Sequence, residues 1–301
     1  MIVALAYNET PSYVAANIPG PYLNSQLGTE WLNWVAELGG LSSHDLVLLT
    51  SPSAELPQSV RAWRSVSHYT DRVNATGWPI GPNETWKQML WILQDLPKVK
   101  KDERWRAPFL WIEPDCIPIR EGWLATLEAE YQVALGAGKA FMGTCVPADP
   151  RHRCPEHMTG NAIYPFDAMV RAPNLGEPKW SIGHPAWDVH ACGQLAQKYH
   201  KINHLLFHWW RHPPPSSTEE LWKRVPATCV LYHSDKELKL IGALRAERRG
   251  EVSDAAKEIA KKFQEPPAGD LSALINAISK RAWSEGEVKV ITQALQGTYG
   301  R

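Results

Sequence analysis

The sequence has no excess of charge of either sign. Its 301 residues include 32 Lys and Arg against 32 Asp and Glu, so the formal net charge at pH 7 is zero. No overall electrostatic field therefore attracts the protein to a polyanion or to a membrane surface. Any contact with nucleic acid has to come from a local basic patch.

Cysteine is scarce, with five residues and no CxxC pair. An odd, scattered set is typical of a reducing cytosol and argues against a disulfide framework, so we expect small core residues at these positions. One group is different, because His152, Cys154 and His157 are spaced closely enough to bind zinc. The sequence shows no clear fourth ligand for such a site.

Long apolar runs are also absent. No apolar stretch approaches the length that spans a membrane. The short run at residues 1–7 has no basic flank and no small-residue cleavage site, so it predicts a first strand and not a signal peptide. We therefore expect a cytoplasmic protein with no membrane partner.

Apolar runs alternate with helical patterns in the first half of the chain. Short runs at residues 2–7, 46–49 and 109–112 predict buried strands, and a fourth is expected at 140–146. Between and beyond them, apolar residues recur at helical spacing, at Trp31, Trp34, Val35 and Leu38, at Trp86, Met89, Leu90 and Leu93, and at Trp123, Leu124, Leu127 and Tyr131. This order predicts an α/β fold with a mainly parallel central sheet flanked by helices.

The second half is less regular. Residues 147–185 are rich in Pro, Gly, His and Arg, which indicates irregular structure, and a helix is expected at 187–199. Residues 229–232 predict a last strand. We therefore predict a main domain at residues 1–240 and a helical C-terminal extension at 241–301, interrupted at 266–270.

Two carboxylates stand where the predicted strand 109–112 ends. Glu113 and Asp115 are two residues apart, so both can turn toward one divalent cation. Acidic residues are common at strand ends in α/β proteins, and this spacing is by itself weak evidence for a metal site.

Two longer segments resemble GT-A glycosyltransferases. Residues 109–118, FLWIEPDCIP, followed by Gly122 and Trp123, resemble the family's DxD region in an ExD form. Residues 230–236, VLYHSDK, resemble the family's later segment, in which a histidine after the last core strand binds the metal and a basic residue lies near the diphosphate.

This resemblance implies a Rossmann-like GT-A domain that uses a nucleotide-diphosphate sugar as donor. It implies that Asp115, His233 and Glu113 hold Mn²⁺ or Mg²⁺, and that Lys236 contacts the donor. A cation there neutralises the diphosphate charge as the sugar leaves. Because the first position is Glu113 and not Asp, this residue either contacts the metal or holds ribose and water.

Residues 158–165, MTGNAIYP, resemble the family's glycine-containing segment beneath the donor sugar and beside the acceptor. Gly160 permits close backbone approach, while Thr159 and Asn161 offer hydrogen bonds to sugar hydroxyls. The alternative is a Gly-Asn turn between a loop and a strand.

The segment HPAWDVH at residues 184–190 resembles the place where these enzymes carry an acidic residue near the acceptor. Trp187 is the expected sugar contact. Asp188 is either the base that takes the acceptor's proton or a helix-end carboxylate stabilised by the helix dipole.

The resemblance covers about residues 1–236 and is weakest at the nucleotide pocket. By analogy with the family, the loop after the first strand and the helix near residue 83 frame the base and ribose. Tyr7, Asn8, Asn83 and Lys87 are the candidates for donor binding.

The sequence thus predicts a metal-dependent glycosyltransferase with a hydroxyl acceptor. The segments FLWIEPDCIP and MTGNAIYP look most like phage and metagenomic enzymes that glycosylate hydroxymethylated pyrimidines in DNA, which implies a DNA acceptor and, for a phage protein, the host cytoplasm. Basic residues lie near aromatic ones at Arg61, Arg64, Arg72, Trp63 and Tyr69, at Lys98, Lys100, Lys101, Arg104, Trp105 and Arg106, and at residues 209–211. Such residues can bind phosphates and stack on bases, or form an ordinary solvated surface. A glycan or protein acceptor, and an inactive binding module, are the alternatives.

Overall fold

The computed structural model describes residues 1–15, 18–73, 80–148, 154–176, 186–195, 198–202, 205–207, 215, 217–248, 288 and 290–293. The chain divides into two compact units. The first comprises Met1–Pro213 and Thr228–Leu238, and the second comprises Pro214–Ala227 and Lys239–Arg301. The domain boundary predicted at residue 240 stays a prediction.

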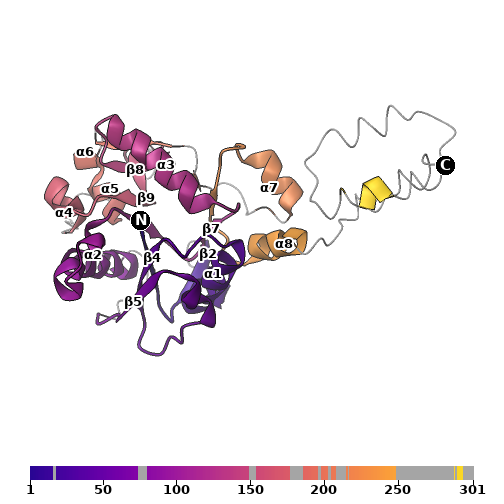
Figure 1. Ribbon diagram of the computed structural model, residues 1–301, viewed down its shortest axis with the longest axis horizontal. Helices are drawn as coiled ribbons and strands as arrows, with labels where there is room; N and C mark the ends of the chain where they lie inside the picture. The colour runs from indigo at the N-terminus through magenta and orange to yellow at the C-terminus, as the bar shows by residue number, and fades with distance from the viewer. Residues whose placement is uncertain are drawn as a thin grey trace. The chain divides into compact units, whose positions relative to one another are not determined.

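A seven-stranded sheet forms the centre of the first unit (Figure 1). Its strand order is β10-β8-β9-β6-β1-β4-β5, and β9 is antiparallel to both of its neighbours while the other pairs are parallel. The strands are β1 (Ile2–Tyr7), β4 (Asp45–Thr50), β5 (Ser65–Thr70), β6 (Phe109–Ile112), β8 (Phe141–Val146), β9 (His157–Tyr164) and β10 (Tyr199–Lys201). The predicted α/β fold with a mainly parallel sheet is confirmed.

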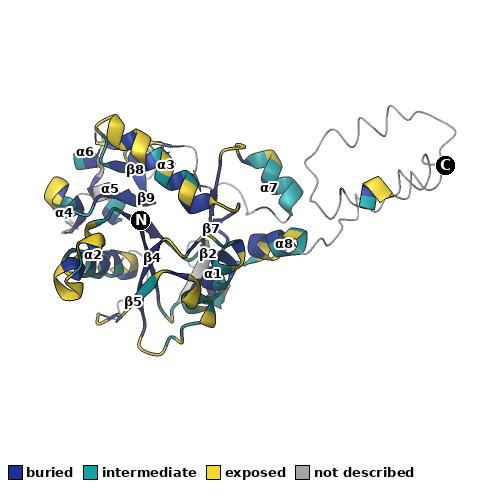
Figure 2. Ribbon diagram, viewed as in Figure 1, coloured by how far each residue is buried: buried dark blue, intermediate teal, exposed yellow. Residues whose placement is uncertain are grey.

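The middle strands are covered on both faces. Every residue of β1, β4 and β6 is buried, as expected for the near-continuous apolar runs of parallel strands (Figure 2). Ile2 is in register with Asp45 on one side and with Phe109 on the other. The carboxyl ends of these three strands therefore meet at one edge of the sheet, which we call the carboxyl edge.

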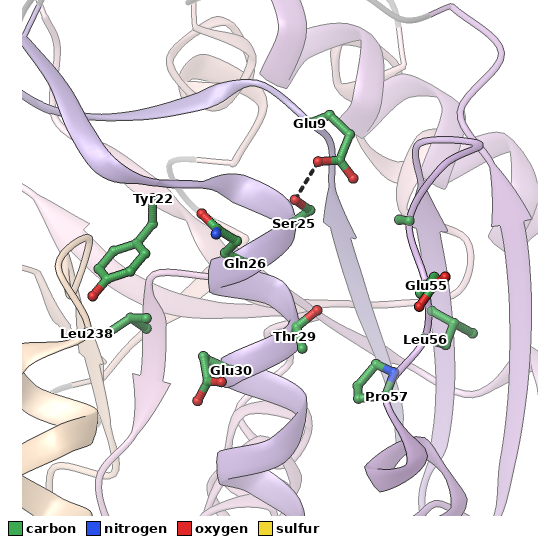
Figure 3. Close-up of a pocket in the computed structure, with 11 residues that line it drawn as sticks. Glu9, Tyr22, Ser25, Gln26, Thr29, Glu30, Glu55, Leu56, Pro57 and Leu238 are labelled. Carbon is green, nitrogen blue, oxygen red and sulfur yellow. Dashed lines mark hydrogen bonds between the residues drawn. The ribbon is translucent and has the colours of Figure 1, made fainter.

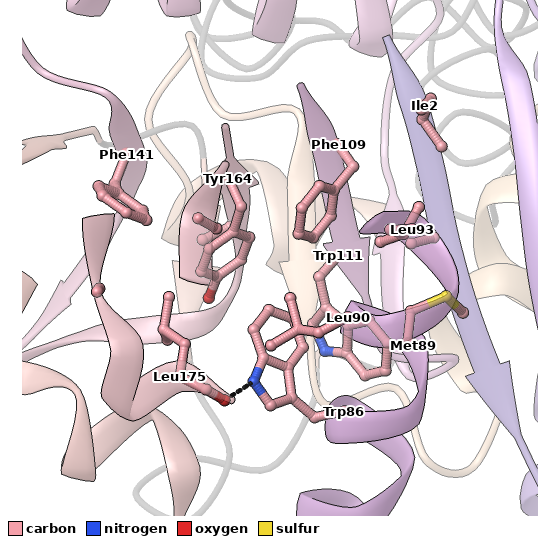
Figure 4. Close-up of a cluster of buried hydrophobic side chains, with 14 of the residues drawn as sticks. Ile2, Trp86, Met89, Leu90, Leu93, Phe109, Trp111, Phe141, Tyr164 and Leu175 are labelled. Atoms are coloured by element: carbon pink, nitrogen blue, oxygen red, sulfur yellow. Dashed lines mark hydrogen bonds between the residues drawn. The ribbon is translucent and has the colours of Figure 1, made fainter. Parts of the chain in front are cut away.

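One face of the sheet packs on α2 (Ile80–Lys100) and α5 (Trp187–His190). Trp86 lies at the centre of this core, among Phe109, Trp111 and Tyr164, and its indole N–H donates to the carbonyl of Leu175 at 2.9 Å (Figure 4). The short elements α4 (Ala168–Arg171) and η4 (Pro173–Leu175) contribute to the same core.

The helices α1 (Asn24–Leu38) and α3 (Trp123–Gly136) contact each other through an edge-to-face pair of Trp31 and Trp123. The buried indole of Trp31 donates to the carbonyl of Cys116 at 2.8 Å, and that of Trp34 donates to the carbonyl of Pro118 at 2.7 Å. Two tryptophans of α1 thereby fix the segment that follows Asp115.

That segment, β7 (Cys116–Pro118), belongs to a second sheet of order β11-β12-β7. Its partners are β12 (Leu231–His233), antiparallel to β7, and β11 (Leu205–Phe207), parallel to β12. The register pairs His233 with Cys116. A hairpin of β2 (Pro11–Ala15) and β3 (Ile18–Leu23) follows β1. The 3-10 helices η1 (Gln58–Ala62) and η2 (Glu103–Arg106) precede β5 and β6.

The second unit contains α7 (Thr218–Arg224) and α8 (Lys239–Arg248). Helix α7 begins where the Ser217 side chain accepts the backbone N–H of Glu220, with Glu in its first turn and basic residues in its last. The helical extension predicted at residues 241–301 stays a prediction. The interruption predicted at residues 266–270 lies outside the described residues. Among the described helices, none is both long and apolar enough to cross a membrane.

Two local predictions were wrong. Residues 147–185 were expected to be irregular, but β9 lies inside the sheet with all eight residues buried. Its Thr, Gly and Asn residues obscure the apolar run that usually marks such a strand. The helix expected at residues 187–199 is instead the short α5, the short α6 (Cys192–Leu195) and then strand β10. The edge strand β5, with sequence SVSHYT, was not predicted because it is polar and only partly buried.

Candidate metal centre and active site

Three side chains predicted to bind metal converge at the carboxyl edge of the sheet. The ligand atoms of Glu113, Asp115 and His233 all lie within 4.8 Å of one another. His233 Nε2 is 3.0 Å from Glu113 Oε2 and 3.3 Å from Asp115 Oδ1. Asp115 and His233 are almost fully buried, whereas the Glu113 side chain is 37% exposed. The cluster is therefore anchored in protein and open to solvent on the Glu113 side.

Strand pairing explains how His233 reaches the two carboxylates. Strand β6 ends at Ile112, and the chain turns through Glu113 and Asp115 into β7, which pairs with β12. The backbone N–H groups of Ser234 and Asp235 then donate to the Asp115 carbonyl at 2.9 and 3.0 Å. Ser234 has a φ of 103°, a region that non-glycine residues seldom adopt and that often marks a functional site.

Charge and burial oppose each other in this cluster. Burial alone raises the pKa of the Asp115 carboxyl, but the charges of His233 and Lys236 outweigh burial and hold that pKa well below its usual range. For His233, burial lowers the pKa, whereas Asp115 and Glu113 raise it to about 10. The Lys236 ammonium is 3.7 Å from Asp115 Oδ2, and its contact with the donor diphosphate stays a prediction.

The cluster suits a divalent cation. Two carboxylates and one imidazole are ligands that Mn²⁺ accepts readily, and the carboxylates also suit Mg²⁺. Asn161 orients the exposed carboxylate, because its amide nitrogen donates to Glu113 Oε2 at 3.0 Å and its amide oxygen accepts the Glu113 backbone N–H at 2.7 Å. Such outer partners are the usual means of fixing a ligand. Asn161, predicted as a sugar contact, thus contacts Glu113.

Asp188 lies near this cluster, at the start of α5 and against β9. Its Oδ1 accepts the Val189 backbone N–H at 2.9 Å, and its Oδ2 accepts the Gly160 backbone N–H at 3.1 Å. Burial raises the pKa of Asp188, His157 lowers it and Glu113 raises it, with a net increase. Its side chain is 21% exposed, so one side of the carboxylate can meet an acceptor. A raised pKa suits a general base.

The other predicted acceptor residues lie inside the core. Trp187 is 4% exposed and stacks on Trp86 with ring centroids 3.8 Å apart, and Thr159 is 3% exposed. The Trp187 backbone N–H donates to the Asn83 side-chain oxygen at 3.0 Å. Direct contact with a sugar stays a prediction for Trp187 and Thr159.

The predicted donor residues Tyr7 and Asn8 lie at the end of β1 and just after it. Tyr7 packs its ring on Gly28 of α1, and burial together with Glu9 raises its pKa to about 12. Asn8 accepts the Thr10 backbone N–H at 3.2 Å and thereby shapes the turn after β1.

The other two predicted donor residues lie on α2. Asn83 contacts α5, and half-buried Lys87 follows it one turn later. The roles of all four residues in donor binding are untested by these contacts and stay predictions.

A hollow of about 680 Å³ lies over the first turns of α1, between Tyr22 and Leu238 on one side and the loop through Pro57 on the other (Figure 3). Three carboxylates line it, those of Glu9, Glu30 and Glu55. Glu9 accepts the Ser25 hydroxyl hydrogen bond at 2.7 Å. A bare diphosphate would be repelled by this lining.

The basic cluster before β6 lies far from the carboxylates. Residues 98–106 precede the amino end of β6, whereas Glu113 follows its carboxyl end, so the two groups lie at opposite edges of the sheet. Several of these charges have acidic neighbours, in the pairs Lys98–Asp95 at 3.6 Å, Arg104–Asp102 at 3.0 Å and Arg106–Glu103 at 3.0 Å. Arg64 is bound to buried Asp45. Residues 209–211 lie outside the described residues.

The spacing of His152, Cys154 and His157 in the sequence predicts these residues as candidate zinc ligands. His152 lies outside the described residues, and Cys154 Sγ is 3.6 Å from His157 Nδ1. The structure also places His157 Nε2 3.9 Å from Asp188 Oδ2. No local sequence signal links these two residues, because they come from separate segments.

No protein-family model matches the chain, and no curated protein matches its sequence. Among solved structures, the chain is similar to mouse xyloside xylosyltransferase 1, with 12% identity, a TM-score of 0.45 and coverage of 77% of this chain and 97% of that one. It is also similar to the galactosyltransferase LgtC, solved with donor and acceptor sugar analogues, with 10% identity, a TM-score of 0.46 and coverage of 84% of this chain and 100% of that one. For the glycosyltransferase GlyE of Streptococcus pneumoniae, the identity is 9% and the TM-score is 0.41, with coverage of 98% of this chain and 64% of that one. These likenesses are distant, so the function proposed below rests on the chain's own residues.

Proposed function

We propose that this protein is a metal-dependent glycosyltransferase that moves a sugar from a nucleotide-diphosphate donor to a hydroxyl acceptor. The observation that carries the proposal is the convergence of Glu113, Asp115 and His233 at the carboxyl edge of a mainly parallel sheet. Ligands of α/β sheets bind at this edge. An inactive binding module would have no need of buried, mutually oriented metal ligands.

The residues in and around the cluster have different roles in sugar transfer. When bound by Glu113, Asp115 and His233, the cation supplies positive charge to the diphosphate as the sugar leaves. Lys236 adds a second positive charge on the same side, 3.7 Å from Asp115. Asp188, with one side exposed, takes the proton from the acceptor hydroxyl.

The test is Asp115→Asn, which preserves the side-chain shape and removes the charge. Mn²⁺ binding, measured by calorimetry, should weaken at least about tenfold, and sugar transfer should fall about a hundredfold or more. The matched control is Asp95→Asn, whose side chain is 62% exposed on α2, and it should behave as the wild type. Unchanged transfer in Asp115→Asn, or full activity after chelation of the metal, would remove the metal from the proposal.

The acceptor has two candidates, since a hydroxymethylated DNA base and a glycan both present the required hydroxyl. The DNA acceptor rests on the sequence resemblance, and Arg72 and Lys87 supply positive charge toward the carboxyl edge. The glycan acceptor agrees with the placement of the basic cluster 98–106 at the opposite edge.

Incubation with Mn²⁺, a panel of nucleotide sugars and either hydroxymethylated DNA or a glycan array, followed by mass analysis, separates the two candidates. A DNA acceptor predicts a mass increase on hydroxymethylcytosine or hydroxymethyluracil DNA and none on unmodified DNA. Transfer to glycans alone would exclude DNA and leave the enzyme class unchanged.

A further inference from the structure

His157 lies beside Asp188. Its spacing from His152 and Cys154, which suggests zinc binding, does not explain this position. It is the first residue of β9, its side chain is 7% exposed, and its Nε2 faces Asp188 Oδ2 at 3.9 Å. On the opposite side of the ring, Nδ1 is 2.9 Å from the carbonyl oxygen of Pro155. The imidazole is therefore held between a backbone carbonyl and a carboxylate.

This geometry determines where the ring proton lies. A carbonyl oxygen can only accept a hydrogen bond, so Nδ1 carries a proton and donates to Pro155. Nε2 then faces Asp188 either with a second proton or with a lone pair. A proton on Nε2 would place a positive charge 3.9 Å from the Asp188 carboxylate, whereas a lone pair there would be unfavourable.

We propose that His157 is a positioning residue for the transfer reaction, which keeps Asp188 ionised and so ready to accept the proton of the acceptor hydroxyl. This inference rests on the proposed function. It extends that function because it adds a second titratable side chain to the proposed base and gives β9 a part in proton transfer.

The proposed step is balanced in atoms and charge. The acceptor O–H bond breaks, the acceptor oxygen bonds to the sugar carbon, and the bond from that carbon to the leaving phosphate oxygen breaks. The proton passes to the Asp188 carboxylate and leaves to solvent from its exposed side. The products are the glycoside, the nucleoside diphosphate and one proton.

The groups that face Asp188 come from three places. His157 and Tyr164 lie on β9, Glu113 lies beyond β6, and Cys154 contacts the His157 ring from the preceding segment. Glu113 opposes ionisation of Asp188, and buried Tyr164 is neutral because burial raises its pKa well above the usual value. Among these groups His157 is the one whose positive charge favours the ionised carboxylate.

The experiment compares His157→Asn with the wild type across pH. An Asn side chain can still donate to Pro155 but leaves nothing charged opposite Asp188. The matched control is His200→Asn, because His200 Nε2 also pairs with a carboxylate, Glu130, at 2.7 Å on another part of the sheet. A general base must be deprotonated, so the acid limb of kcat/KM should move to higher pH in His157→Asn by about one pH unit.

At neutral pH the expected loss in kcat is about tenfold, with an unchanged KM for the donor and partial recovery at higher pH. His200→Asn should keep the wild-type profile. A purely structural role for His157 would lower kcat equally at every pH, and that result would overturn the inference.

A second measurement does not depend on turnover. The carboxyl ¹³C resonance of Asp188 should titrate at higher pH in His157→Asn than in the wild type, because His157 favours the ionised carboxylate, and an unchanged midpoint would also overturn the pairing. If the wild type transfers no sugar to any acceptor, the proposed function fails, and the resonance comparison then decides the His157–Asp188 pairing by itself.

Discussion

The pKa of a carboxylate in this protein depends on the groups that face it. Asp45, Asp115 and Asp188 are all held in protein, yet the pKa is lowered for Asp45 and Asp115 and raised for Asp188. Desolvation raises the pKa of all three carboxyl groups, and a positive charge close to the carboxylate is needed to outweigh it. Asp45 has Arg64 Nε at 3.0 Å and the Ser65 hydroxyl at 2.6 Å, whereas His157 stands 3.9 Å from Asp188.

Asp45→Asn should therefore lower the free energy of unfolding at pH 7 by about 2 kcal/mol, since the Arg64 and Ser65 hydrogen bonds to a buried charge are weakened. The folded pKa of Asp45 is depressed, so its stabilisation is complete above the unfolded value of about 3.9 and is lost as the pH falls through the folded pKa.

Urea denaturation at pH 7 and near pH 3 would measure this effect. The difference between wild type and variant should shrink at the acidic pH, and an equal difference at both values would contradict the linkage. Asp95→Asn is the matched control, and should change stability by less than about 0.5 kcal/mol because its ion pair with Lys98 is exposed.

At the scale of elements, the contact between β9 and α5 determines where Asp188 lies. Gly160 allows this contact, because a Cβ on it would come within 2.9 Å of the Trp187 ring and 3.6 Å of Asp188 Oδ2. Trp187 cannot move away easily, since it stacks on Trp86 in the core. Close packing makes such an interface sensitive to a single methyl group.

Gly160→Ala should accordingly displace α5 and lower sugar transfer by about a hundredfold, with a stability loss of about 1–3 kcal/mol. Transfer assays and thermal unfolding check both effects. Gly136→Ala is the control, because Gly136 lies in α3 with nothing within 4 Å of the added Cβ, and it should leave activity unchanged. Wild-type transfer in Gly160→Ala would show that the position of Asp188 does not limit the reaction.

At the scale of the whole chain, the two edges of the central sheet carry different chemistry. The candidate metal ligands lie at the carboxyl edge, and the basic residues 98–106 lie at the other. A four-residue strand such as β6 spans on the order of 13 Å, so residues at its two ends cannot contact the same small group.

The double variant Lys100→Gln, Lys101→Gln should therefore keep wild-type kcat/KM toward a small hydroxyl acceptor. If the acceptor is DNA that extends over both edges, the same variant should weaken DNA binding and reduce its salt dependence, because fewer phosphates are contacted. Transfer rates and binding at several salt concentrations distinguish these cases. A large loss of activity toward the small acceptor would contradict the separation of the edges.

Several elements could be predicted from the amino-acid sequence because the information for them is local. Strands β1, β4 and β6 appear as apolar runs, α1, α2 and α3 appear as helical periodicity, and Glu113 and Asp115 stand directly after a strand. Burial on two faces imposes those patterns residue by residue, so they can be read without knowing the fold.

The contacts between distant segments could not be predicted and are known from the three-dimensional fold. The pairing of β7 with β12 brings His233 to Asp115, and the insertion of antiparallel β9 brings His157 and Gly160 to Asp188. Such contacts depend on strand order and register, which leave no periodic signal in the segments that they join. For the same reason the sequence does not show that Trp187 is buried, since its burial depends on the distant Trp86, on which it stacks.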